Sequence, residues 1–93
     1  MIMDRVTAET VALQAMAYLL EEDHLRDRFL NFTGMTGDIL KAQLGETDFL
    51  ASLLSFFVDH EPDLIALANT LAVPPELVVK AWHVLGGSVG RDF

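Results

Sequence analysis

Residues 68–82 read ANTLAVPPELVVKAW, a pattern typical of a helix, a tight turn and a second helix. Such a unit needs a small residue where the helices cross and apolar residues on both sides of the turn. Five residues meet that spacing, namely Ala68, Leu71, Val73, Val78 and Ala81. Ala72 occupies the turn position that often carries glycine. The stretch therefore predicts two helices that cross at a short turn and resemble a helix-turn-helix.

The positions of this unit that would face a DNA groove are poor in the groups that bind DNA. In a helix-turn-helix alignment they are Pro74, Pro75, Glu76, Val79, Lys80 and His83. Base readout depends on Arg, Lys, Asn and Gln, and affinity depends mostly on cations that contact phosphates. Any two helices packed across a short turn need the same small and apolar residues, so we favour packing as the explanation. A divergent DNA-binding module with Lys80 and His83 as contacts stays an alternative.

The sequence before this unit is helical as well. Thr7 is expected to cap a helix over about residues 8–22, whose faces are apolar or alanine apart from a narrow polar stripe. The stripe consists of Thr7, Thr10, Gln14 and Glu21. A helix of that kind is usually packed on several sides, so we place it near the centre of the fold.

Two shorter helices are predicted next. Asp23 is expected to cap the first of them, which ends at Gly34. The face expected to be buried consists of Leu25, Phe29 and Phe32. Thr36 is expected to cap the second, which ends at Gly45.

The most apolar predicted helix begins after Thr47 and covers about residues 48–61. Its large apolar residues are too many for one buried stripe: Phe49, Leu50, Leu53, Leu54, Phe56, Phe57 and Val58. We therefore expect a second core element whose surplus aromatic side chains face a partner.

The last two helices are expected to begin close to prolines. Pro62 suits the first turn of the fifth helix, with His60 or Glu61 at its cap. Pro75 suits the start of the sixth, which the glycines 86–87 end. No alternation with the period of a strand competes with this interpretation.

Length and composition predict a single domain. The chain has 93 residues, of which 52% are hydrophobic and 22% are charged. We expect an all-α, compact bundle of five or six short helices over residues 1–93, with frayed ends at about 1–6 and 88–93 and with Trp82 sealing one side. The mean hydropathy of +0.35 is high for so small a domain. Some apolar surface is therefore expected to meet a partner.

The charge balance is strongly acidic. Fourteen acids against six bases make a formal net charge of −8, and the cations are scattered along the chain. Such a field repels phosphate backbones and anionic lipids, so nucleic acid is an improbable partner and no membrane partner is expected. The chain has no cysteine and no apolar run near the roughly 20 residues of a membrane span, so a soluble cytoplasmic protein is expected.

No pattern of catalytic or metal-binding residues is present. His60 and Glu61 begin like a zinc-protease motif, but no second histidine follows four residues after the first. The serines, namely Ser52, Ser55 and Ser88, stand in no nucleophile motif. Most acids fall at helix starts, where they complement the helix dipole. We predict no enzyme activity, no cofactor and no metal, and we expect the histidines, His24, His60 and His83, to be structural.

Four stretches together carry a resemblance: ETVALQAMAYLLEED, RFLNFTGMTGDIL, FLASLLSFFVDHEPDLIALA and AVPPELVVKAWHVLGG. In this order they resemble domain of unknown function family 3572, a family of short all-helical, mostly alphaproteobacterial proteins. The resemblance covers about residues 9–87. It implies a compact all-α domain from the bacterial cytoplasm, and it implies no activity, cofactor or catalytic residue.

We therefore predict a non-catalytic protein-interaction module whose partner is an unidentified protein or, in a homodimer, a second copy of the chain. The candidate apolar interface consists of Met35, Leu44, Phe56 and Phe57. The DNA-binding or transcription-associated module described above is the first alternative. The second is a small apolar-ligand-binding protein whose pocket is lined by Met16, Tyr18 and the phenylalanines.

Overall fold

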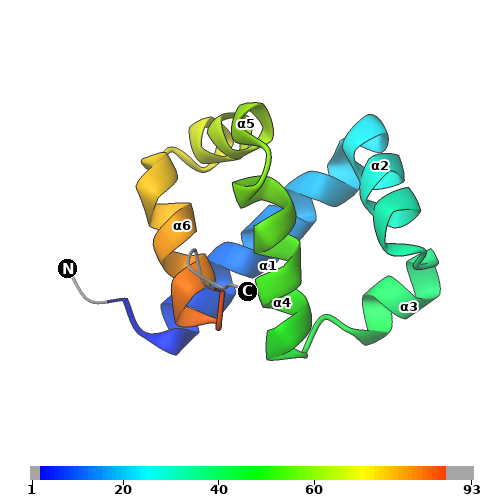
Figure 1. Ribbon diagram of the computed structural model, residues 1–93, viewed down its shortest axis with the longest axis horizontal. Helices are drawn as coiled ribbons and strands as arrows, with labels where there is room; N and C mark the ends of the chain where they lie inside the picture. The colour runs from blue at the N-terminus through cyan, green and yellow to red at the C-terminus, as the bar shows by residue number, and fades with distance from the viewer. Residues whose placement is uncertain (1–2, 88–93) are drawn as a thin grey trace.

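Six helices make up the ordered framework of the computed structural model, which describes residues 3–87 (Figure 1). They are α1 (Arg5–Glu21), α2 (Asp23–Thr33), α3 (Gly37–Ala42), α4 (Thr47–Val58), α5 (Glu61–Leu71) and α6 (Pro75–Val84). No strand occurs among the described residues. The predicted all-α bundle is confirmed.

The first helix begins earlier than predicted because Asp4, and not Thr7, is its cap. The Asp4 side chain accepts a hydrogen bond of 2.8 Å from the backbone N–H of Thr7, which places Thr7 inside the first turn. Met3 is buried, so residues 3–6 belong to the ordered fold and the expected fraying at 1–6 is wrong for them. The predicted fraying at 88–93 lies outside the described residues.

Helices α1, α4 and α6 contact one another and form the centre of the bundle. The predicted central position of α1 is confirmed, since it also contacts α2 and α5. Its exposed face is wider than the predicted polar stripe, because Leu13 and Leu20 are exposed too. Leu19 of α1, Leu53 of α4 and Val78 of α6 are all completely buried. Trp82 is 3% exposed and seals the core beside Gly87, as predicted for the tryptophan.

The fourth helix begins with Thr47 itself rather than after a threonine cap. The N-cap residue is Glu46, which makes no side-chain capping bond. The Thr47 hydroxyl instead accepts a hydrogen bond of 2.7 Å from the guanidinium of Arg5. This contact joins the starts of α1 and α4. The Thr47 hydroxyl therefore makes a tertiary hydrogen bond and does not cap its own helix.

The α5–α6 unit has the geometry of a helix-turn-helix. The two helix axes are bent by 102° at the turn, and Ala72 adopts the left-handed conformation with φ of 58°. The backbone N–H of Val73 donates to the carbonyl of Ala68 at 3.0 Å and closes the turn. The fifth helix takes His60 as its N-cap residue, one of the two predicted candidates.

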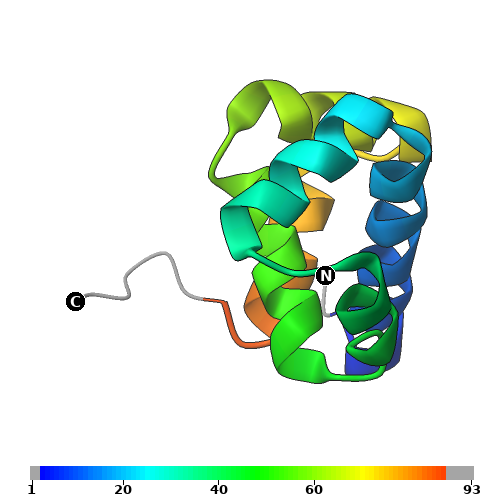
Figure 2. The ribbon, with the colours of Figure 1, turned by 90° about the vertical axis from the view of Figure 1, so that its right-hand side faces the viewer.

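Helices α2 and α3 lie at one end of the molecule, across α1 and α4 (Figure 2). Gly34 ends α2 in the left-handed conformation and Thr36 caps α3 through a 3.2 Å bond from Ile39, as predicted. The N-cap residue of α2 is Glu22 rather than Asp23, and α3 ends at Ala42, before the expected Gly45. Helix α2 packs on α1, and the residues of its last turn, 31–33, are exposed.

Candidate functional site

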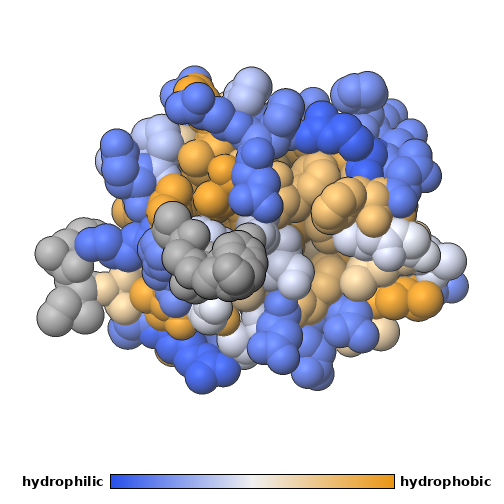
Figure 3. Space-filling view, viewed as in Figure 1, coloured by the Kyte–Doolittle hydropathy of each residue, from blue (hydrophilic) through white to orange (hydrophobic). Residues whose placement is uncertain are grey.

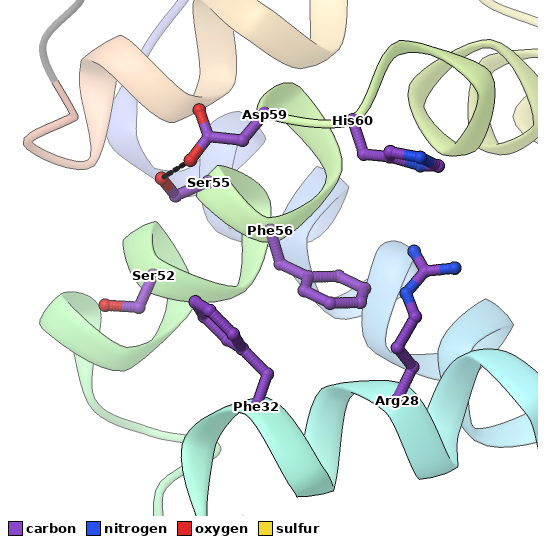
Figure 4. Close-up of a pocket in the computed structure, with 7 residues that line it drawn as sticks. All are labelled: Arg28, Phe32, Ser52, Ser55, Phe56, Asp59 and His60. Atoms are coloured by element: carbon purple, nitrogen blue, oxygen red, sulfur yellow. Dashed lines mark hydrogen bonds between the residues drawn. The ribbon is translucent and has the colours of Figure 1, made fainter.

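Aromatic side chains line a groove between α2 and α4. It consists of two adjoining hollows of about 370 and about 430 Å³, which share Phe32 and Ser52. The first hollow is lined by Arg28, Phe32, Ser52, Ser55, Phe56, Asp59 and His60 (Figure 4). The second is lined by Phe29, Phe32, Thr33, Met35, Gln43, Asp48, Phe49 and Ser52. We call this feature the α2–α4 groove.

Three phenylalanines pack in a row from the core to the solvent, with increasing exposure along the row. Phe29 is 1% exposed and packs edge-on against Phe56, with ring centroids 5.1 Å apart. Phe56 is half-buried and lies 6.3 Å from Phe32. Phe32 is 78% exposed, the highest value among the exposed large apolar residues of the described part of the chain. Figure 4 shows Phe32 extending from α2 toward α4, and Phe56 extending from α4 toward Arg28 of α2.

The exposed position of Phe32 corrects the expectation that it shares a buried face with Leu25 and Phe29. Residues three apart on a helix differ in direction by about 60°. Phe29 is buried in the middle of α2, whereas Phe32 lies in the last turn, whose residues 31–33 are exposed. The signal in the sequence was the position of Phe32 two residues before Gly34, which ends the helix.

Charged groups close one end of the groove. The guanidinium of Arg28 lies 5.1 Å from the centroid of the Phe56 ring and also forms an ion pair with Asp63 of α5. The Asp63 carboxylate lies 2.8 Å from Nδ1 of His60 as well. A cation over an aromatic face is attracted by the ring quadrupole, so Arg28 holds Phe56 in place while Asp63 holds Arg28. These contacts make a rigid, polar end to an apolar groove.

The predicted apolar interface is brought together only in part. Met35 lines one hollow of the groove and Phe56 lines the other, and both are half-buried. Leu44 is half-buried against the core and lines neither hollow. Phe57 is completely buried, so its assignment to an exposed interface is wrong. On α4, Phe56 and Phe57 differ by about 100° in direction, and only the core-facing one is enclosed.

The groove appears on the surface as an apolar area between α4 and α2, bordered by hydrophilic side chains (Figure 3). Apolar surface with a polar rim is the usual anatomy of a protein-binding site, and aromatic residues with arginine are enriched at the centre of such sites. The arrangement is suited to burying an apolar side chain of another molecule.

The candidate DNA contacts lie on α6, away from this groove. Lys80 is half-buried and lines a hollow of about 240 Å³ with Pro74, Glu76 and Leu77. His83 is exposed, and its Nδ1 lies 3.2 Å from the carbonyl oxygen of Gly87. Glu76 is the acid that lines that hollow together with Lys80.

The residues proposed for an apolar-ligand pocket are not lining one cavity. Met16 is 3% exposed and belongs to the core. Tyr18 packs against Phe57, with ring centroids 6.2 Å apart, and lines an open hollow of about 220 Å³ between α1 and α5.

Ser55 and Asp59, which both line the groove, are paired with each other. The Ser55 hydroxyl is directed to the Asp59 carboxylate at 3.5 Å, and not to a histidine, while Ser88 lies outside the described residues. Within residues 3–87, no group of three or more His, Cys, Asp or Glu side chains is placed to hold a metal ion.

A helix that crosses a bilayer needs about 20 predominantly apolar residues. Among the helices that the structure describes, none is by itself long and apolar enough to cross a bilayer, although the bent pair α5 and α6 meets the criterion by length and composition when taken together.

Comparison with known proteins identifies one relationship. A family model described as a protein of unknown function (DUF3572) matches residues 5–88. No curated protein and no solved structure matches the chain significantly. The match extends over all six helices.

Proposed function

We propose that the chain, which belongs to the DUF3572 family, is a non-catalytic bacterial protein-interaction module that binds its partner in the α2–α4 groove. The cytoplasm is the compartment that we propose, because a chain without cysteine suits a reducing environment. The observation that carries the proposal is the exposure of Phe32 beside the half-buried Phe56.

An exposed phenylalanine over a hollow is a favourable point for binding. Burial of a phenylalanine side chain contributes about 1.5–3 kcal/mol relative to its exposed state. Phe32 retains 78% of its exposure in the free protein, so most of this free energy is still available for a partner. Phe56 and Phe29 behind it are already ordered by ring packing, so binding costs little side-chain entropy there.

A different protein is a better occupant than a second copy of this chain. Two copies that approach each other would each carry a formal net charge of −8 over the whole chain. Like charges at an interface slow association and oppose it, and salt screens this effect. We therefore commit to a partner of another sequence that presents an apolar anchor to the groove.

The test is an affinity pull-down from bacterial lysate at low and high salt with three baits: the native chain, Phe32→Ser and Ile65→Ser. Ile65 is a matched control, because it is an exposed apolar residue on α5 outside the lining of the groove. We expect one protein to be retained at high salt by the native chain and by Ile65→Ser, and to be lost by Phe32→Ser. Equal recovery with all three baits would exclude the groove as the binding site.

A second candidate function rests on the 102° bend and the left-handed Ala72 of the α5–α6 unit, which are compatible with DNA binding. This candidate predicts salt-sensitive binding to duplex DNA that weakens when Lys80 is replaced by alanine. Lack of duplex binding at low salt in a gel-shift experiment would exclude it. The formal net charge of −8 makes this candidate the weaker one.

A further inference from the structure

A polar stripe runs along α4 at the edge of the groove. Asp48, Ser52, Ser55 and Asp59 follow one another at intervals of four, three and four residues, which places them on one face of the helix. Each of the four lines at least one hollow of the groove. The two serines in the middle are small, so a bound chain can approach the α4 backbone closely there.

The stripe has a hollow on its other side as well. This hollow of about 260 Å³ lies between α4 and the end of α6 and shares Asp48, Ser52 and Ser55 with the stripe. Its far wall is formed by Trp82, Leu85, Gly86 and Gly87. The stripe is therefore a low ridge between two depressions, and helices pack on one another by fitting ridges into such grooves.

The two ends of the ridge carry acids. Asp48 lies in the first turn of α4 and Asp59 directly follows its last turn, and both are exposed. Eleven residues separate them, a distance of about 16 Å along a helix. Figure 4 shows Asp59 at one end of the groove, with Ser55 and Ser52 following it.

Arg28, the arginine in the groove, does not cancel the negative charge of these two acids. Arg28 forms its ion pair with Asp63, so the pair is neutral in sum. The charged residues of the ridge itself are Asp48 and Asp59, and both are exposed acids. Charge complementarity at an interface steers association and selects the partner, and here it selects cations.

From this geometry we propose that the partner segment is a basic amphipathic helix that lies along α4. An apolar side chain of this helix enters the groove and packs on the exposed Phe32 ring. Two of its Lys or Arg side chains, about eleven residues apart, contact Asp48 and Asp59. The inference rests on the proposed function, because it names the kind of partner that the same groove binds.

The probes that test this inference are three fluorescent helical peptides of about 18 residues with one apolar stripe. The first carries two lysines eleven residues apart, the second carries glutamates at the same positions, and the third carries lysines only four residues apart. Fluorescence anisotropy with the native chain should show the first peptide binding about tenfold more tightly than the second at about 50 mM salt. The third should bind less tightly than the first, because it reaches only one of the two acids.

Charge variants locate the contacts. Combined Asp48→Asn and Asp59→Asn substitutions should reduce the affinity for the first peptide by about three- to tenfold, the range expected of two exposed ion pairs. Glu76→Gln is the matched control, since it removes an exposed acid from α6, away from the ridge, and should leave the affinity unchanged. Thermal unfolding of each variant verifies that the fold is intact.

The outcomes separate this inference from the proposed function. Equal binding of the lysine and glutamate peptides, still abolished by Phe32→Ser, would overturn the basic partner and support the groove. No binding of any peptide would also overturn the basic helix, and the lysate experiment would then decide on the groove independently. Binding that Phe32→Ser leaves unchanged would contradict both.

Discussion

Arg28 of α2 and Asp63 of α5 form an ion pair between residues 35 positions apart in the sequence. The Asp63 side chain is 18% exposed and also lies 2.8 Å from Nδ1 of His60. The pair connects α2 to α5 at one end of the groove. It therefore helps to set the position of the groove wall that carries Phe32.

Replacement of Arg28 by glutamine should destabilise the fold and loosen this wall. Hydrogen bonds to charged groups contribute about 1.5–3 kcal/mol, and partial exposure of Arg28 places the expected loss near the lower end. Arg26→Gln is the control, because Arg26 pairs with Asp23 and Asp27 of its own helix, both exposed, and should change stability by less than about 0.5 kcal/mol. Urea unfolding measures the free energy of unfolding of both variants. Equal losses for the two substitutions would show that the Arg28–Asp63 ion pair does not stabilise the fold.

Truncation of Phe32 and truncation of Phe29 should change stability to very different extents. Phe32→Ser removes an exposed side chain and should change the free energy of unfolding by no more than about 0.5 kcal/mol. Phe29→Ala leaves a cavity in the core and should cost about 3–5 kcal/mol. Urea unfolding distinguishes them, and a large loss for Phe32→Ser would show that this residue supports the fold.

Gly87 is expected to tolerate no side chain, because it lies against the indole of Trp82. A Cβ at this position would overlap the indole nitrogen and its neighbouring ring carbons. Gly87→Ala should therefore destabilise the protein by about 1–3 kcal/mol. Gly45→Ala is the control, since nothing lies within 4 Å of a Cβ there. If both variants melt at the same temperature, the contact between Gly87 and Trp82 does not constrain the core.

Ala72→Gly should stabilise the turn between α5 and α6. Ala72 has φ of 58°, a conformation that costs an L residue about 1–2 kcal/mol and costs glycine little. After the greater chain entropy of glycine in the unfolded state is subtracted, a net gain of up to about 1 kcal/mol remains. Ala17→Gly, at an exposed position inside α1, should lose about 1 kcal/mol. Opposite signs in thermal unfolding are the expected result, and a loss at both positions would contradict a left-handed Ala72.

The Asp4 cap should make stability depend on pH in the acid range. Hydrogen bonds from the side chain and then the backbone of Thr7 lower the pKa of Asp4 below its ordinary value of 3.8. A carboxylate whose pKa is lower in the folded state stabilises the fold above that ordinary value, and the contribution is lost as the pH falls through the folded pKa. Asp4→Asn keeps an acceptor but does not titrate. The stability difference between the native chain and Asp4→Asn should shrink between pH 5 and pH 2, and a constant difference would exclude the cap.

The helices themselves followed from local signals in the sequence. Apolar residues at helical spacing, the prolines at the starts of α5 and α6 and the glycine after α2 act within a few residues, so each could be recognised without a fold. The α5–α6 unit was predicted for the same reason, because its crossing depends on a short turn and on small residues near it. These features establish an all-α bundle and the order of its parts.

The surface of the bundle depended on contacts between distant residues. Which of Phe32, Phe56 and Phe57 is exposed follows from the rotation of α2 and α4 relative to the core, and the period of the sequence alone does not set that rotation. Thr47 bonds to Arg5 instead of capping its own helix, which only a contact over 42 positions explains. Local sequence thus determined where the chain is helical, whereas packing decided which side chains form the groove, because exposure is a property of neighbours that the chain brings together only on folding.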